Sequence, residues 1–246
     1  KDYEGAMSDL KKMDKPGQMG YLFKGLTKYK LRDYEESVSD LNKAIELGAE
    51  RPDSYKFRGA SKLYLYDYLG AISDLNRAIE LGIDGADSFF QRGIAKRELE
   101  NYKGALEDLT RAIKITPDNA FFYYERAVLY YRTKQDSEAI ADLNKAIDIL
   151  SDNAVFYLLR GQVKFELKDK DGGCVDLNKA ILIEDDKEVR RSIQEQIDEN
   201  CLGMTKAKAI AKLKELKELL ELEVITQEDY DKEKAILSPI ILGKEQ

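Results

Sequence analysis

Residues 33–45 read DYEESVSDLNKAI, and residues 67–79 read DYLGAISDLNRAI. The two segments align without a gap at an offset of 34 residues, and the same offset continues three more times along the chain. A fixed period of this length is typical of repeat proteins, in which each repeat is one supersecondary unit. The sequence therefore predicts an array of similar units over most of its length.

Small and large residues recur at fixed places in each unit. Large residues open the first half at Tyr21, Tyr55, Phe89, Tyr123 and Tyr157. Small residues follow in the first half at Gly25, Gly59, Gly93, Ala127 and Gly161, and in the second half at Ser37, Ala71, Ala105, Ala139 and Gly173. The second half also keeps Leu41, Leu75, Leu109, Leu143 and Leu177, and then Ala44, Ala78, Ala112, Ala146 and Ala180. Small residues at these places allow close contact between two helices.

The composition favours helices. The chain has 246 residues, of which 43% are hydrophobic and only 4 are proline. Leu, Ala, Glu and Lys are frequent, and these residues have high helix propensity. So few prolines argue against a sheet of short strands joined by tight turns. The predicted fold class is all-α.

This pattern resembles the tetratricopeptide repeat (TPR), a 34-residue unit of two antiparallel helices. The resemblance covers five repeats over residues 18–187, and residues 1–17 resemble the end of a partial first repeat. It implies a right-handed α-solenoid of helix-turn-helix units, with a concave groove lined by first helices. Stacking is also expected physically, because one hairpin is too small to bury its own apolar stripe. Residues 188–203 have only a narrow apolar stripe, Val189, Ile193 and Ile197, and are expected to form a capping helix.

Residues 204–246 follow a different pattern. A Leu-rich segment is followed by Val224-Ile225-Thr226 and then by an acidic segment with Tyr230. Thr226 and Asp229 predict the start of a helix. This segment resembles the bacterial short C-terminal domain called SHOCT, which implies a small helical hairpin for self-association or tethering, a bacterial source and no chemistry. Its lysines also permit a membrane-surface helix, but the glutamates among them favour a solvated face.

A basic residue precedes the first small residue of every unit, where the TPR family usually has leucine. The basic residues are Lys24, Arg58, Arg92, Arg126 and Arg160, and an aspartate follows each of them sixteen positions later, at Asp40, Asp74, Asp108, Asp142 and Asp176. We expect a ladder of buried or half-buried salt bridges that sets helix register; a row of ligand-binding arginines is the alternative. Reversing both charges of the Arg92–Asp108 pair is then expected to restore most of the stability lost in either single reversal.

The resemblance places a peptide-binding groove on the first helices. The candidate residues mix aromatic, apolar and a few polar side chains: Leu22, Phe23, Leu26, Lys56, Phe57, Phe90, Gln91, Ile94, Tyr124 and Val128. Leu26, Phe90, Ile94, Tyr124 and Val128 could instead pack against the next hairpin. Left uncovered, the set would form a large exposed apolar patch, which favours a bound peptide, an amphipathic helix or the chain's own tail. Asn is absent from the groove positions that hold a terminal carboxylate in some TPR proteins, so such a clamp is not expected.

Several kinds of chemistry are excluded by residue type. The chain has no His, so it cannot build a Ser-His-Asp or Cys-His site, and its 2 Cys are too few for a thiolate zinc cage. Residues 169–173 lack the later ligands of a calcium loop. A net charge of −7 argues against a nucleic-acid partner. We therefore expect no enzyme activity, no cofactor, no metal, no nucleic acid and no membrane span.

The cysteines and the start of the chain leave the compartment open. Cys174 is expected to be a small core residue, and two cysteines do not make a disulfide framework. The chain begins at Lys1 with a partial repeat, so we expect a fragment or a processed chain. A cytoplasmic location is favoured, and the bacterial envelope is the alternative if a signal segment precedes it.

The sequence thus predicts a non-catalytic adaptor that binds a protein or peptide segment in its groove. The alternative from another class is a structural protein that self-assembles through its C-terminal module. A regulatory subunit of a separate enzyme is a third reading that the sequence does not distinguish from the first.

Overall fold

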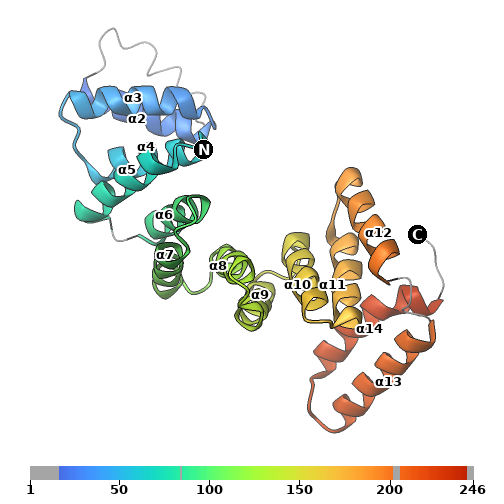
Figure 1. Cartoon of the computed structure of the whole chain (residues 1–246). Coiled ribbons are helices and arrows are strands. Elements are labelled where there is room, and N and C mark those ends of the chain that lie inside the picture. The colour runs from blue at the N-terminus through green and yellow to red at the C-terminus, as the bar shows by residue number, and fades with distance from the viewer. Residues whose placement is uncertain (1–16, 84, 202–205, 243–246) are drawn as a thin grey trace. The chain divides into compact units, whose positions relative to one another are not determined.

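The computed structural model describes residues 17–83, 85–201 and 206–242, and these residues form helices without any strand (Figure 1). The partial repeat predicted at residues 1–17 lies almost wholly outside the described residues. The chain divides into two compact units, residues 1–129 and 130–246, which are described separately. No helix among the described residues is long and apolar enough to cross a membrane.

The N-terminal unit is a stack of helical hairpins. Its helices are α2 (Gln18–Lys30), α3 (Tyr34–Glu46), α4 (Pro52–Tyr64), α5 (Tyr68–Glu80), α6 (Ala86–Glu98), α7 (Tyr102–Ile115) and most of α8 (Ala120–Arg132). Helices α2 and α3, α4 and α5, and α6 and α7 pair as hairpins, and α3 packs on α4 as α5 does on α6 (Figure 1). The recurring small residues lie at these contacts: a Cβ atom added to Gly59 would lie 3.0 Å from Leu75 Cγ.

The C-terminal unit continues with more helices. These are α9 (Asp136–Ile149), α10 (Ala154–Glu166), α11 (Lys170–Ile183), α12 (Lys187–Cys201), α13 (Lys206–Glu221) and α14 (Gln227–Leu242). Helix α12 packs on α11 and adds Ile193, which is 1% exposed, to a core cluster with Tyr157 and Ala180. Helices α13 and α14 pair with each other, and α14 also contacts α11 (Figure 1).

Helix α11 differs from the other second helices because it is apolar on two sides. Val175 is buried in a cluster with Leu216, Ile236 and Leu237 of α13 and α14. The matching positions of the other repeats hold Ser39, Ser73, Glu107 and Ala141. The fifth repeat is therefore the one whose outer side is built to be covered by α13 and α14.

One left-handed residue ends each first helix. The residues have φ near +60° and recur at the 34-residue spacing: Arg32, Tyr66, Glu100, Lys134 and Lys168. In the third repeat the Asn101 N–H donates to Lys96 O at 2.9 Å, which satisfies a carbonyl at the end of the helix. None of the five is glycine, although glycine adopts this conformation without the steric cost that a Cβ atom imposes.

Replacing Glu100 by glycine is expected to raise the free energy of unfolding by about 0.5–1 kcal/mol, because the left-handed turn would lose its steric penalty. Urea-induced unfolding followed by circular dichroism measures the change. Glu100→Ala keeps the Cβ atom and is the matched control, for which we expect no gain. A Glu100→Gly variant that is no more stable than Glu100→Ala would contradict this account of the turn.

Candidate functional site

The predicted ladder residues lie close together in three repeats. Each arginine donates two hydrogen bonds from its guanidinium to the aspartate sixteen residues later. The Nη2–Oδ1 distances are 2.6 Å for Arg58–Asp74, 2.5 Å for Arg92–Asp108 and 2.6 Å for Arg160–Asp176. The aspartates are 4%, 4% and 1% exposed. Such bidentate pairs fix both the distance and the orientation of the two helices of a hairpin.

Each of these aspartates also holds a lysine that sequence reasoning missed. Lys62 Nζ lies 2.8 Å from Asp74, Lys96 Nζ lies 2.7 Å from Asp108, and Lys164 Nζ lies 2.9 Å from Asp176. The lysine comes four residues after the arginine, so both cations share one face of the first helix. That spacing was a visible signal, since a lysine occurs at this place in four of the five repeats.

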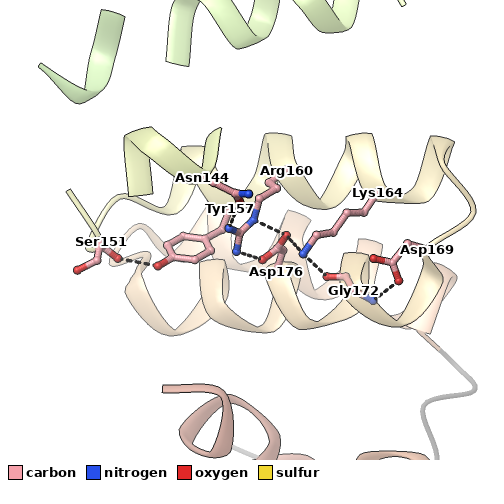
Figure 2. A network of polar contacts seen from close by, with 8 residues as sticks. All are labelled: Asn144, Ser151, Tyr157, Arg160, Lys164, Asp169, Gly172 and Asp176. Atoms are coloured by element: carbon pink, nitrogen blue, oxygen red, sulfur yellow. Dashed lines mark hydrogen bonds and ion pairs between the residues drawn. The ribbon is translucent and has the colours of Figure 1, made fainter. Parts of the chain in front are cut away.

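A second partner links each arginine to the preceding repeat. The free Nη1 of Arg160 donates to Asn144 Oδ1 at 2.7 Å (Figure 2). Arg58 and Arg92 donate in the same way to Asn42 and Asn76, at 2.8 Å and 2.7 Å. The guanidinium therefore joins its own hairpin to the hairpin before it. The recurring Asp-Leu-Asn segment carried this signal.

One member of the predicted ladder differs, in the first full repeat. In the first full repeat the cation on Asp40 is Lys28, at 2.8 Å, and Lys24 Nζ instead lies 5.8 Å from the centre of the Tyr21 ring. The pairing expected of Lys24 is therefore corrected to Lys28, which lies one helical turn further along α2. In the fourth repeat Arg126 Nη1 donates to Thr110 Oγ1 at 3.2 Å, and Asp142 is 6% exposed on α9.

Each arginine, with its aspartate and lysine, forms one rung of the ladder. The rung of Arg160, Lys164 and Asp176 shows the electrostatic effect of these contacts. Burial by itself lowers the pKa of Arg160, but the hydrogen bonds and the charge of Asp176 outweigh it and raise that pKa above its ordinary value. Lys164 also approaches Gly172 O at 3.4 Å, and the Asp169 side chain accepts from the Gly172 N–H at 2.9 Å (Figure 2). Each charged group of this rung has a partner within the protein, so the arrangement joins helices.

A row of aromatic side chains crosses the first helices of the N-terminal unit. Tyr29 of α2 meets Phe57 of α4 edge-on, with ring centres 5.2 Å apart. Tyr34 and Tyr64 are stacked at 4.4 Å with an angle of 7° between their planes. We call these four residues the aromatic cluster. Burial, together with the neighbouring Tyr64 and Tyr34, raises the pKa of Tyr29 to about 12, so its hydroxyl stays neutral.

A cavity of about 390 Å³ adjoins this cluster between α4 and α6. We call it the aromatic pocket; its lining residues are Leu63, Tyr64, Tyr66, Tyr68, Phe90, Gln91, Ile94 and Glu98. Tyr64 and Tyr66 are 52% and 77% exposed. Phe90 continues the row toward α8, because its ring lies 4.7 Å from that of Phe122. The pocket thus presents open aromatic faces with one amide and one carboxylate.

The predicted groove residues lie in several different environments. Phe90, Gln91 and Ile94 line the aromatic pocket, Phe57 belongs to the aromatic cluster, and Phe23 is 51% exposed on α2. Lys56 approaches Asp87 at 3.4 Å, and Leu26, Tyr124 and Val128 are half-buried. Leu22 is corrected: it is 3% exposed and packs with Leu41, Ala44 and Ala49, so it belongs to the core. Tyr66 and Tyr68, which also line the aromatic pocket, were missed.

A second cavity, of about 470 Å³, lies where α13 and α14 meet the last repeat. Glu233 of α14 faces it together with Lys164 of the ladder. The other charged residues that face Glu233 or line the cavity are Arg160, Asp169, Asp171, Asp176, Lys212, Glu215 and Asp229. Burial raises the pKa of Glu233, and the nearby Asp176 adds to this, while Lys164, Arg160 and Lys212 oppose it.

We expect Glu233→Gln to stabilise the C-terminal unit at pH 7 by an amount on the order of 1 kcal/mol, because a neutral amide avoids the desolvation of the carboxylate. A raised pKa means that the folded state holds the proton more tightly, so wild-type stability falls as pH rises above the ordinary value of 4.5. The advantage of the variant should therefore grow from pH 4.5 to pH 7 in thermal unfolding. Glu218→Gln on the exposed side of α13 is the control. A pH-independent difference would contradict the prediction.

Cys174 is 1% exposed, as expected of a core residue, but it is also bonded to Cys201 at the end of α12. The sequence separation is 27 residues. Two cysteines so far apart carry no pairing signal until α12 is known to pack on α11.

Family models match three stretches of the chain. A model described as TPR repeat matches residues 93–134, and one described as tetratricopeptide repeat matches residues 20–48 and 122–153. No curated protein matches the chain significantly.

Solved structures give the same fold. The chain is similar to YrrB, "a TPR protein with an unusual peptide-binding site", at 18% identity and a TM-score of 0.61, over 79% of this chain and 98% of that one. It is similar to MamA from Desulfovibrio magneticus, at 18% identity and 0.63, over 68% and 94%. It is also similar to a thermophilic TPR protein from Thermus thermophilus, at 15% identity and 0.57, over 76% and 100%. The chain therefore contains tetratricopeptide repeats and has the predicted all-α solenoid fold.

Proposed function

We propose that the chain is a non-catalytic scaffold that binds a peptide or a helix of another protein along the first helices of its N-terminal unit. The observation that carries this proposal is the aromatic pocket between α4 and α6, next to the aromatic cluster. Tyrosine side chains offer large apolar faces with few rotatable bonds, and their hydroxyls can bond a peptide backbone. Exposed aromatic anchors of this kind dominate the energetics of many protein interfaces.

The charge around the pocket supports an occupant held mainly by apolar contacts. Arg97 is already bonded to Glu98 and Glu125, and Lys56 lies near Asp87. The nearby cations therefore have partners within the protein. The likeness to YrrB, whose printed description includes a peptide-binding site, fits this proposal and by itself concerns only the fold.

A displayed library of random peptides, selected on the full chain, tests the proposal. Selected peptides are then titrated against three proteins: the wild type, the double variant Tyr64→Ser/Phe90→Ser, and the control Leu182→Ser. The control replaces an exposed leucine on α11. We expect the first variant to bind at least about tenfold more weakly, because loss of a hot-spot side chain costs more than about 1.4 kcal/mol. Equal binding by all three proteins would reject the pocket as the site.

We also propose three regions: repeats over residues 1–187, a capping helix over 188–203 and a SHOCT-like hairpin over 204–246. A second function, self-assembly through that hairpin, is favoured by one observation. Leu222 and Val224, in the turn between α13 and α14, are 72% and 65% exposed. Apolar residues at a hairpin tip can form a contact between copies.

Light scattering of the full chain and of Leu222→Ser/Val224→Ser tests self-assembly. A wild-type oligomer that becomes a monomer in the variant would support it. A monomeric wild type would reject it and leave the scaffold reading alone.

A further inference from the structure

The Cys174–Cys201 disulfide lies at the root of the C-terminal hairpin. Cys174 stands on α11 where the other repeats have Val38, Ile72, Leu106 and Ile140, so a bonded sulfur replaces an ordinary apolar side chain. Cys201 is the last residue of α12, and α13 begins only five residues later, at Lys206. The bond therefore ties the starting point of α13 directly to α11.

The residue next to Cys174 is an apolar contact between the last repeat and the hairpin. Val175 is the buried residue that α11 contributes to the cluster with Ala209, Leu216, Ile236 and Leu237. The disulfide and the docking contact thus occupy neighbouring positions of one helix.

The docking interface also contains a cavity and a partly buried carboxylate. Beside Val175 lies the 470 Å³ cavity, in which Glu233 is held close to Asp176 as well as to Lys164. A cavity and a desolvated carboxylate both reduce the free energy that the interface gains from burial. The docking equilibrium of α13 and α14 on α11 therefore depends on the length of chain between α13 and a fixed point on α11.

We propose that the Cys174–Cys201 disulfide is a redox latch that keeps the C-terminal hairpin docked on the last repeat, and that its reduction releases the hairpin. With the bond closed, α13 is five residues from a point fixed on α11. With it open, the covalent path from Cys174 to Lys206 is 32 residues, of which α12 holds part by packing. Loop-closure scaling then predicts a docking equilibrium weaker by roughly three- to tenfold.

The reductant is a dithiol, and Cys201 is the sulfur it reaches, because Cys201 is half-buried whereas Cys174 is 1% exposed. Its thiolate attacks Cys201 Sγ, the S–S bond breaks, and Cys174 leaves as a thiolate that takes up a proton. The second thiol of the reductant then displaces Cys201. The products are two protein thiols and one oxidised dithiol, with two electrons and two protons transferred.

Hydrogen exchange of the full chain, measured by mass spectrometry before and after reduction with a dithiol, tests the latch. Exchange in α13, α14 and the last turn of α12 should speed up by about three- to tenfold, while α10 keeps its rate. Cys201→Ser, which leaves Cys174 in place and makes no cavity, should match the reduced wild type and ignore the reductant.

Three outcomes would overturn the proposal. Unchanged exchange in α13 and α14 would show that the bond does not control docking. An equal rise from α10 through α14 would show an ordinary stabilising cross-link. Two free thiols in the air-oxidised chain would show that the bond does not form. The peptide-binding proposal is independent of all three, because its site lies in the N-terminal unit.

Discussion

Asp108→Ala is expected to lower the free energy of unfolding of the N-terminal unit by about 3–5 kcal/mol. Asp108 is 4% exposed and accepts hydrogen bonds from Arg92 at 2.5 and 2.8 Å, and Lys96 Nζ lies 2.7 Å away. Its removal leaves two cations together, mostly shielded from water and without their shared counter-charge. The loss of stability comes mainly from the two cations left buried without a counter-charge. The net contribution of the intact rung to stability is smaller, because desolvation of the charges offsets much of their attraction.

Urea-induced unfolding of Asp108→Ala and of its exposed neighbour Glu107→Ala measures the effect. Substitution of Glu107, which lies on the same turn of α7, should change stability by less than about 0.5 kcal/mol. If the two variants were equally stable, the rung would have no structural importance.

The structure changes the expected result of reversing the pair. An arginine at position 108 would lie beside Lys96, and an aspartate at position 92 could not donate to Asn76. Reversal of Arg92 and Asp108 alone should therefore recover only part of the lost stability. Adding Lys96→Glu to the double reversal should recover more, which makes the lysine's share measurable.

Leu75→Ala is expected to lower the free energy of unfolding by about 3–5 kcal/mol, because it leaves a cavity that the two packed helices cannot fill. Leu75 is fully buried, and Gly59 brings the backbone of α4 close to it, so that an added Cβ would lie 3.0 Å from Leu75 Cγ. Leu69→Ala on the same helix is the matched control, since Leu69 is 72% exposed. Denaturant midpoints of the two variants should differ clearly, and equal midpoints would show that the recurring leucine does not form the core.

Helix register was predictable because it depends on residues that recur. The 34-residue period places Leu41, Leu75 and Leu109 at equivalent contacts, and all three are at most 1% exposed. The arginine and aspartate of each rung were visible for the same reason. The lysine and asparagine partners recur too, at Lys62 and Asn42 for example, but they lie one helical turn away and in the preceding repeat, outside the arginine–aspartate spacing.

Features that depend on a single repeat were much harder to predict. The disulfide occurs once and requires α12 to fold back on α11. Helical periodicity predicts which residues form an apolar stripe, but it does not predict which edge of the stripe the next hairpin covers. For this reason Leu22 was expected in the groove, whereas it lies in the core. Tyr66 was missed because its left-handed turn follows the helix, outside the stripe where groove residues were sought.

The central claim is that the aromatic pocket of the N-terminal unit binds a protein segment. The most direct test is isothermal titration of one library-selected peptide into the wild type and into Tyr64→Ser/Phe90→Ser, after circular dichroism shows equal helix content in both. We predict saturable binding to the wild type and a dissociation constant at least about tenfold larger for the variant. Equal dissociation constants would contradict the claim and place the binding surface elsewhere on the chain.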